Sequence, residues 1–187
     1  MPDIIIYLDM DEVLVDFVGG ACAAHGWTRE QFEKVRTPGV WSMPEFMGLS
    51  LDEFWEPIHA AGENFWFDLN PTPWCKEVIE LAEEYSKEWH IVTAPSRCET
   101  SYTGKVRWLK SYFGPQFNNF VITPHKHILA QEHTWLIDDR EKNVESFCED
   151  GGNALCFPNL GNNLHAYHND PVGHLRSLDL ETYFFLA

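Results

Sequence analysis

Basic residues are scarce in this chain of 187 residues, and their scarcity excludes one large class of partner. The sequence holds 13 Lys and Arg against 29 Asp and Glu, a formal net charge of −16. Such a surface repels the phosphates of DNA and RNA, so no nucleic acid polymer is expected as a partner. A small phosphorylated ligand stays compatible with this charge, because a bound cation and a few local donors can reverse the potential inside one cleft.

Long hydrophobic runs and paired cysteines are missing as well. No apolar stretch approaches the roughly 20 residues of a membrane-spanning helix, and the N-terminal segment lacks the basic region of a signal peptide. The five cysteines never form a C-x-x-C pair, which argues against both a disulfide framework and a zinc site. These absences predict a soluble cytoplasmic protein with reduced thiols and no membrane partner. They leave a monomer and a homodimer equally open.

What the sequence does contain is an alternation of short apolar runs and amphipathic segments. Residues 4–8 form a continuous, β-branched run, which is typical of a strand buried on both faces. Further strand-like runs lie at residues 90–92, 120–122, 135–137 and 154–157. Helical periodicity fits residues 76–88, 103–113 and 140–149. Alternating strands and helices predict an α/β fold with a doubly wound parallel sheet.

One long segment, residues 19–72, does not fit this alternation. Its helical pieces lie at residues 21–25, 29–35 and 51–61. A single crossover between parallel strands does not need such a length. We therefore expect a core of residues 1–18 and 73–187, with residues 19–72 inserted after the first strand as a small helical cap over the carboxyl end of the sheet.

Polar side chains follow four of the predicted strands. In chain order they are Asp9 and Asp11, Thr93, Lys126, and Asp138 with Asp139. Open α/β sheets bind ligands at the carboxyl ends of their strands, so we expect these side chains to converge. Converging carboxylates repel one another unless a hard cation neutralises them, and oxygen ligands suit Mg²⁺.

Together these groups match the requirements of phosphoryl transfer to water. A cation, a hydroxyl from Thr93 and an ammonium from Lys126 would hold the phosphoryl oxygens. One aspartate could attack phosphorus in line, and a second, two residues along, could protonate the leaving oxygen and then activate water. Taken alone, the aspartates and Thr93 also have structural explanations: an acidic residue after a strand can cap a helix, and Thr93 can bond its own backbone.

The order of these motifs, D-x-D, then Thr, then Lys, then Asp-Asp, resembles the haloacid dehalogenase (HAD) superfamily. By that resemblance, Asp9 is the nucleophile and a magnesium ligand. Asp11 is the general acid/base and provides its backbone carbonyl as a metal ligand. Asp138 completes the metal site, with Asp139 beside it. An aspartate at position 11 implies a phosphatase rather than a dehalogenase or an ion-pumping ATPase.

The same resemblance implies that Thr93 and Lys126 bind phosphate. A second lysine, Lys105, lies on the helix after the second strand and competes for that role. We favour Lys126, because the start of the helix that carries Lys105 lies farther from the predicted sheet edge.

A narrower resemblance runs from the first strand to about Phe157. The segments that carry it are DMDEVLVDF at 9–17, NFWF at 64–67, YFGP at 112–115 and LIDDR at 136–140. They look like the 5′(3′)-deoxyribonucleotidase family, which implies dephosphorylation of deoxyribonucleoside monophosphates. By position, Phe17 and Trp41 would flank the nucleobase, with Arg140 nearby; stacking of this kind contributes about 1 kcal/mol per contact.

Two departures concern the substrate rather than the chemistry. Ala94 stands where this family tends to have a hydroxyl residue, and Pro124 and His125 stand where an arginine is expected before Lys126. Alternatives therefore stay open: a HAD phosphatase for another small phosphate, such as a phosphosugar or a phosphonate, or a non-catalytic nucleotide-binding or phosphate-binding relative. A receiver domain fits less well, because its acidic pair follows the first strand.

Overall fold

The computed structural model describes residues 4–180, which fold around a five-stranded parallel sheet. The strands are β1 (Ile5–Leu8), β2 (Glu88–Thr93), β3 (Phe120–Ile122), β4 (Thr134–Asp138) and β5 (Asn153–Cys156). Their order in space is β3-β2-β1-β4-β5, and every neighbouring pair is parallel. The predicted doubly wound α/β fold is confirmed, and each predicted strand lies within two residues of an observed one.

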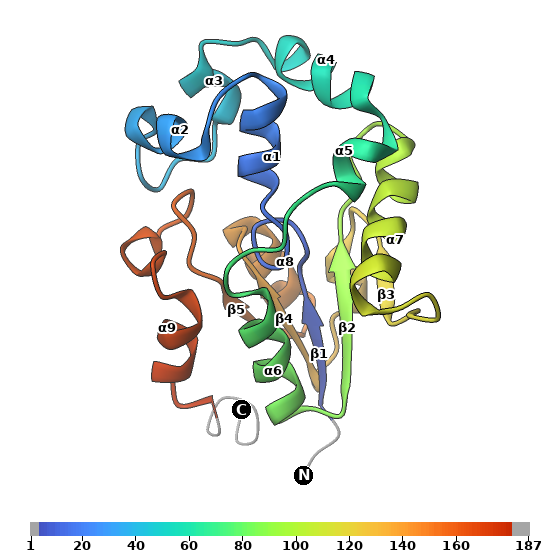
Figure 1. Ribbon diagram of the computed structural model, residues 1–187. Coiled ribbons are helices and arrows are strands. Elements are labelled where there is room, and N and C mark those ends of the chain that lie inside the picture. The colour runs from blue at the N-terminus through green and yellow to red at the C-terminus, as the bar shows by residue number, and fades with distance from the viewer. Residues whose placement is uncertain (1–3, 181–187) are drawn as a thin grey trace.

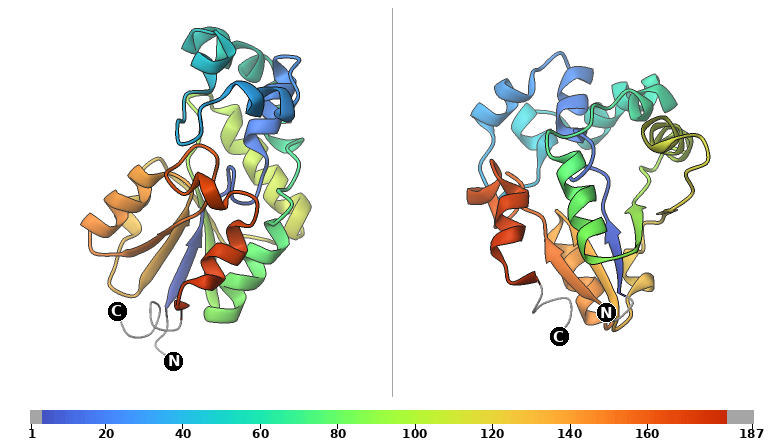
Figure 2. Two further views of the ribbon diagram at one scale, coloured as in Figure 1. Left: turned by 90° about the vertical axis from the view of Figure 1, so that its left-hand side faces the viewer. Right: turned by 60° about the horizontal axis from the view of Figure 1, so that its bottom comes forward.

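Helices cover both faces of this sheet (Figure 1, Figure 2). Those of the core are α6 (Cys75–Tyr85), α7 (Thr100–Phe113), α8 (Glu141–Glu149) and α9 (Pro171–Ser177), with short 3-10 helices η1 (Lys126–Leu129) and η2 (His165–Tyr167). Helices α6, α7 and α9 lie on one face, where Ile6 and Leu8 join the large core, and α8 lies on the other, where Tyr7 packs near Phe147. Within residues 4–180, no helix has both the length and the apolar character needed to cross a membrane.

Five helices lie between β1 and α6, above the carboxyl ends of the strands (Figure 1). They are α1 (Phe17–Ala24), α2 (Arg29–Val35), α3 (Met43–Met47), α4 (Leu51–Ala61) and α5 (Glu63–Phe67). Helices α2 and α4 have the predicted bounds, and each begins with a capping box, at Thr28 and at Ser50. Helix α1 begins earlier than predicted because the Asp16 side chain accepts a hydrogen bond from Gly19 N at 2.7 Å. The short helices α3 and α5 were not predicted.

One end of this five-helix segment is joined closely to the core. Helix α5 packs against α7 at Gly104, where a Cβ would lie only 2.4 Å from the Glu63 carbonyl oxygen and 2.6 Å from Trp66 Cβ. Because only glycine permits this approach, position 104 sets how near the two helices come. Farther along α7, the Trp108 indole donates a hydrogen bond to the Leu69 carbonyl at 2.7 Å. These contacts anchor α5 on the helix that carries Lys105.

Candidate active site

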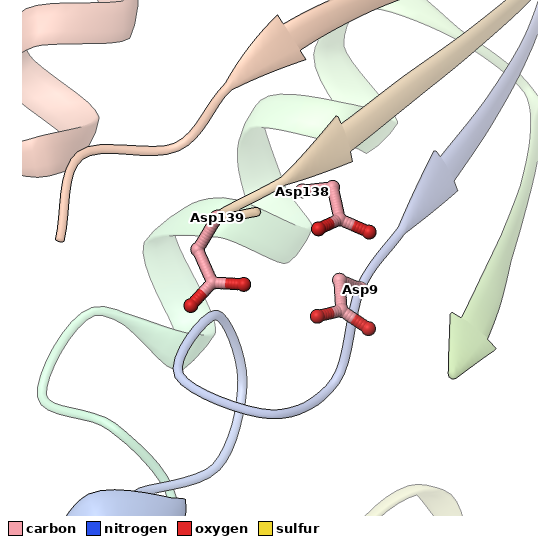
Figure 3. Close-up of side chains that lie close together, drawn as sticks. All are labelled: Asp9, Asp138 and Asp139. Atoms are coloured by element: carbon pink, nitrogen blue, oxygen red, sulfur yellow. The ribbon is translucent and has the colours of Figure 1, made fainter. Parts of the chain in front are cut away.

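Three carboxylates converge where β1 and β4 end (Figure 3). Asp9 follows β1, Asp138 is the last residue of β4, and Asp139 comes next. All three are buried, and each offers an oxygen within 4.8 Å of the others. The parallel pairing of β1 with β4 brings these positions together, as the amide of Asp9 donates to the Ile137 carbonyl at 2.9 Å. The predicted convergence at this sheet edge is therefore present.

The ammonium of Lys126 lies between two of these carboxylates. It donates to Oδ1 of Asp9 and, at 2.6 Å, to Oδ2 of Asp138. Burial opposes the positive charge of Lys126, but the attraction of Asp9 and Asp138 outweighs it and raises the pKa of the lysine. Lys126 therefore stays protonated, and η1, where it is the first residue, places a fixed cation in the acidic cluster.

One ammonium does not neutralise this cluster. Burial, together with the charges of Asp138 and Asp11, raises the pKa of Asp9 to about 7, although Lys126 opposes the shift. Burial, with repulsion from Asp9 and Asp138, raises the pKa of Asp139 well above its ordinary value. The raised pKa values mean that the negative charge of these carboxylates is unfavourable without a further cation. Because their oxygens are hard donors, the cluster fits a divalent cation such as Mg²⁺.

Asp11 and the second lysine form another pair at the same edge. Lys105 is fully buried and donates to Oδ2 of Asp11 at 2.6 Å, to Oγ1 of Thr93 at 2.7 Å and to the Ala94 carbonyl at 2.8 Å. These acceptors account for all three hydrogens of its ammonium. The other oxygen of Asp11, Oδ1, is buried and has no hydrogen-bond partner among the described residues. Asp11 is thus held by one of its two carboxylate oxygens.

Asp138 is held in place from its own side of the site. Asn143 Nδ2 lies 3.0 Å from both carboxylate oxygens of Asp138, and the backbone amide of Arg140 donates to Oδ1 at 2.9 Å. The side chain of Arg140 is exposed. Sequence reasoning did not single out Asn143; its position in the first turn of the helix that follows Asp138 is the signal that could have pointed to it.

The two aromatic residues expected around a base have different surroundings. Phe17 is half-buried and stacks on Trp66, with ring centroids 5.7 Å apart and an interplanar angle of 20°. Trp41, between α2 and α3, packs so closely over Gly161 that a Cβ there would lie 2.7 Å from the indole ring. The indole nitrogen of Trp41 is buried without a hydrogen-bond partner in the described part of the chain. Phe17 therefore belongs to an aromatic cluster, and Trp41 to the contact between the five-helix segment and the loop after β5.

A third group of polar residues near the site escaped sequence reasoning. Glu12, directly after Asp11, is buried and is the one non-glycine residue of 4–180 with positive φ, at 62°. Its carboxylate accepts from Arg29 of α2 at 3.0 Å and from Asn159 at 3.4 Å. Asn159 also donates to Oδ2 of Asp139 at 3.1 Å. No local pattern marks these partners, since they come from distant parts of the chain.

Comparison with known protein families agrees with this arrangement. The family model for "5' nucleotidase, deoxy (Pyrimidine), cytosolic type C protein" matches residues 3–172. A Staphylococcus epidermidis protein named "Putative 5'(3')-deoxyribonucleotidase" is 30% identical over 186 residues, which cover 96% of this chain and 94% of that protein. The human mitochondrial 5'(3')-deoxyribonucleotidase is 29% identical over 155 residues, covering 72% of this chain and 61% of the human one.

Solved structures with the same fold are more distant in sequence. A HAD family hydrolase from Deinococcus radiodurans, with bound phosphate and sodium, has a TM-score of 0.59 at 14% identity and covers 97% of this chain and 96% of its own. A HAD-hydrolase from Bacillus subtilis bound to magnesium has a TM-score of 0.52 at 15% identity, with coverages of 88% and 97%. At such identities the likeness concerns the fold alone.

Proposed function

We propose a function for this chain from the premise that it belongs to the family of 5' nucleotidase, deoxy (Pyrimidine), cytosolic type C proteins. It is a phosphatase of the HAD superfamily. We propose that it hydrolyses (deoxy)ribonucleoside monophosphates in a Mg²⁺-dependent reaction through an aspartyl-phosphate intermediate. The names of its relatives support the substrate class, and the acidic cluster supports the metal.

In this proposal, the side chains of Asp9 and Asp138 and the backbone carbonyl of Asp11 would hold Mg²⁺, with Asp139 beside them. When bound, the cation supplies a positive charge that holds a phosphoryl oxygen and offsets charge in the transition state. The fit rests on the burial of three neighbouring carboxylates and on the raised pKa values of Asp9 and Asp139.

The chain's own residues carry the bond-making steps. A carboxylate oxygen of Asp9 attacks phosphorus in line, a new P–O bond forms, and the bond to the leaving nucleoside oxygen breaks while Asp11 gives that oxygen its proton. Asp11 then takes a proton from water, whose oxygen attacks the same phosphorus and releases inorganic phosphate and the Asp9 carboxylate. The contact with Lys105 supports this role for Asp11, because it fixes one carboxylate oxygen, while the other makes no hydrogen bond to the described residues.

Thr93 and Lys126 would bind the remaining phosphoryl oxygens. Lys126 sits beside the nucleophile, where an ammonium can also bind an oxygen of the transferring group. Lys105 already has three acceptors in the protein, which supports a role in holding Asp11 and Thr93 in place rather than in binding phosphate.

Recognition of the nucleoside belongs to the five-helix segment in this proposal. Residues 19–72 would form the cap over a core of residues 1–18 and 73–187, and Phe17 and Trp41 would flank the base, with Arg140 nearby. The aromatic cluster around Phe17 supports an apolar, flat ligand rather than a sugar alone. All five cysteines are free, which supports a cytoplasmic location.

The observation that carries the proposal is the meeting of Asp9, Asp11 and Asp138 with two buried lysines at one sheet edge. The test is a hydrolysis screen of nucleoside monophosphates and sugar phosphates with Mg²⁺, beside an EDTA control. We expect release of inorganic phosphate from deoxyribonucleoside monophosphates and none with EDTA. Turnover of sugar phosphates with uniformly poor turnover of nucleotides would contradict the substrate class and leave the chemistry intact.

A further inference from the structure

The backbone at Glu12 raises a question that the proposed chemistry does not answer. Glu12 has φ 62°, in the left-handed region where glycine is preferred. A non-glycine residue persists in such a conformation only when its surroundings hold it there. The Glu12 side chain must therefore make interactions that glycine could not supply.

Those interactions occupy both oxygens of the Glu12 carboxylate. Oε1 accepts from the amide of Val18 at 2.7 Å, near the start of α1, and lies 3.4 Å from Nη1 of Arg29. Oε2 accepts from Nη2 of Arg29 at 3.0 Å and from Nδ2 of Asn159 at 3.4 Å. With these donors around it, Glu12 is not placed to act as a metal ligand. It joins α1, α2 and the loop after β5 at one point.

The same loop holds Asp139. Nδ2 of Asn159 bridges Oε2 of Glu12 and Oδ2 of Asp139, the latter at 3.1 Å. Asn162 Nδ2 donates to the Asp139 backbone carbonyl at 2.7 Å, and both asparagines are buried. The five-helix segment touches this loop again where Gly39 N donates to the Leu160 carbonyl at 2.9 Å. A continuous series of contacts thus leads from α2 through Arg29, Glu12 and Asn159 to the acidic cluster.

We infer that Glu12 is a positioning residue that links the placement of α2 to the orientation of Asp139 in the proposed metal site. Its two side-chain partners are Arg29 from the five-helix segment and Asn159 from the core. The linkage rests on the proposed function, since Asp139 matters here as a neighbour of the cation. Groups behind metal ligands commonly change metal affinity by about 10-fold to 100-fold when they are removed.

The test measures Mg²⁺ binding by isothermal titration calorimetry of EDTA-treated, dialysed protein without substrate. Arg29→Gln is the decisive variant, because Arg29 touches none of the three carboxylates and its loss leaves the Thr28 capping box of α2 in place. We expect Arg29→Gln and Glu12→Gln each to weaken Mg²⁺ binding by about tenfold, and Arg29→Lys to recover most of the loss. The matched control is Glu30→Gln, which breaks the exposed Lys34–Glu30 pair on the same helix and should bind Mg²⁺ like the wild type.

Glu12→Gly separates the side chain from the backbone conformation, because glycine adopts φ 62° without penalty. It should weaken Mg²⁺ binding as Glu12→Gln does. Amide hydrogen exchange gives a second readout: Mg²⁺ should slow exchange in α2 of the wild type and do so less in Asn159→Ala.

The outcomes are distinguishable from failure of the proposed function. Wild-type protein that binds no Mg²⁺ would contradict the metal site itself. If the wild type binds Mg²⁺, and the variants Arg29→Gln, Glu12→Gln and Glu12→Gly bind it with the same affinity, only the linkage is overturned. A difference in α2 amide exchange between the wild type and Asn159→Ala, with Mg²⁺ affinity unchanged in every variant, would also overturn the linkage, since Glu12 would then serve the fold alone.

Discussion

The ammonium of Lys105 lies 2.6 Å from Oδ2 of Asp11, although 94 positions separate the two residues in the sequence. This contact gives the two buried lysines different surroundings, because Lys126 faces Asp9 and Asp138 instead. We predict that Lys126→Met loses the greater part of the affinity for inorganic phosphate. Lys105→Met should mainly lower kcat, since it releases Asp11 and Thr93. Calorimetric titration of each variant with phosphate in Mg²⁺ checks the order, and a larger loss of affinity in Lys105→Met would reverse the assignment.

Replacing the nucleophile should stop turnover without unfolding the protein. Asp9→Asn keeps the size and hydrogen-bonding shape of the side chain but removes the attacking oxygen. We expect hydrolysis of p-nitrophenyl phosphate to fall below about a thousandth of the wild-type rate. Circular dichroism should stay unchanged, and Asp52→Asn, the same substitution at an exposed position of α4, should keep full activity. Retained activity in Asp9→Asn would remove Asp9 from its role.

Asp11→Asn should separate binding from turnover. The amide can still accept a hydrogen bond from Lys105, so the local structure should persist. It cannot give or take the proton that the leaving group and the water need, so we expect kcat to fall by about 100-fold or more. Affinity for inorganic phosphate in Mg²⁺ should stay within a few-fold of the wild type. Unchanged kcat would show that another group handles the proton.

The raised pKa of Asp9 gives the metal-free protein a definite pH dependence. In the folded chain the pKa of Asp9 is about 7, raised above its ordinary value of 3.8 mainly by burial. The folded state therefore binds more protons than the unfolded state between these values. Stability from this group is fully present below about pH 4 and is lost as the pH rises through about 7.

Thermal unfolding in EDTA at a series of pH values between 4 and 8 checks this dependence. The unfolding midpoint should fall as Asp9 ionises, and Mg²⁺ should raise it most at the upper end of the series, because cation binding requires the ionised carboxylate. Asp9→Asn should make this fall smaller and leave the part that comes from Asp139, whose pKa burial also raises. An equal fall of the midpoint in the wild type and in Asp9→Asn would contradict the raised pKa of Asp9.

Replacing Phe17 should raise KM for nucleotides more than KM for small phosphates. Phe17→Leu keeps an apolar residue in the cluster with Trp66 but removes the ring face. If Phe17 contacts the base, KM for a deoxyribonucleoside monophosphate should rise about fivefold, corresponding to about 1 kcal/mol, while KM for acetyl phosphate stays the same. Phe117→Leu, which changes a ring packed on Phe113 beyond the end of α7, is the control. Equal effects on both substrates would assign Phe17 to packing.

The strands and the sheet edge could be predicted from sequence because both depend on local patterns. The apolar run at residues 4–8 and those at 90–92 and 135–137 mark strands by composition alone, and Asp9 and Asp138 follow two of them directly. Parallel pairing then brings their carboxyl ends together whatever the rest of the chain does.

The partners of these side chains could not be predicted in the same way. Asn159 lies 147 positions from Glu12, and Lys105 reaches Asp11 from the middle of α7. Such contacts depend on how separate elements pack, which no local period records. Helix α5 was missed for a related reason, because its residues Phe65 and Trp66 are buried against neighbours distant in sequence and show little helical pattern over five residues.

The close approach of α5 to α7 at Gly104 also limits how this chain can vary. A methyl group at position 104 would meet the Glu63 backbone, so even alanine would push α5 away from the helix that carries Lys105. Related sequences that keep α5 in this position should therefore keep glycine there. A relative with a larger residue at position 104 should attach the segment above the sheet differently. The ammonium of Lys105, which now lies 5.0 Å from the centroid of the Trp66 ring, would then be covered by another side chain.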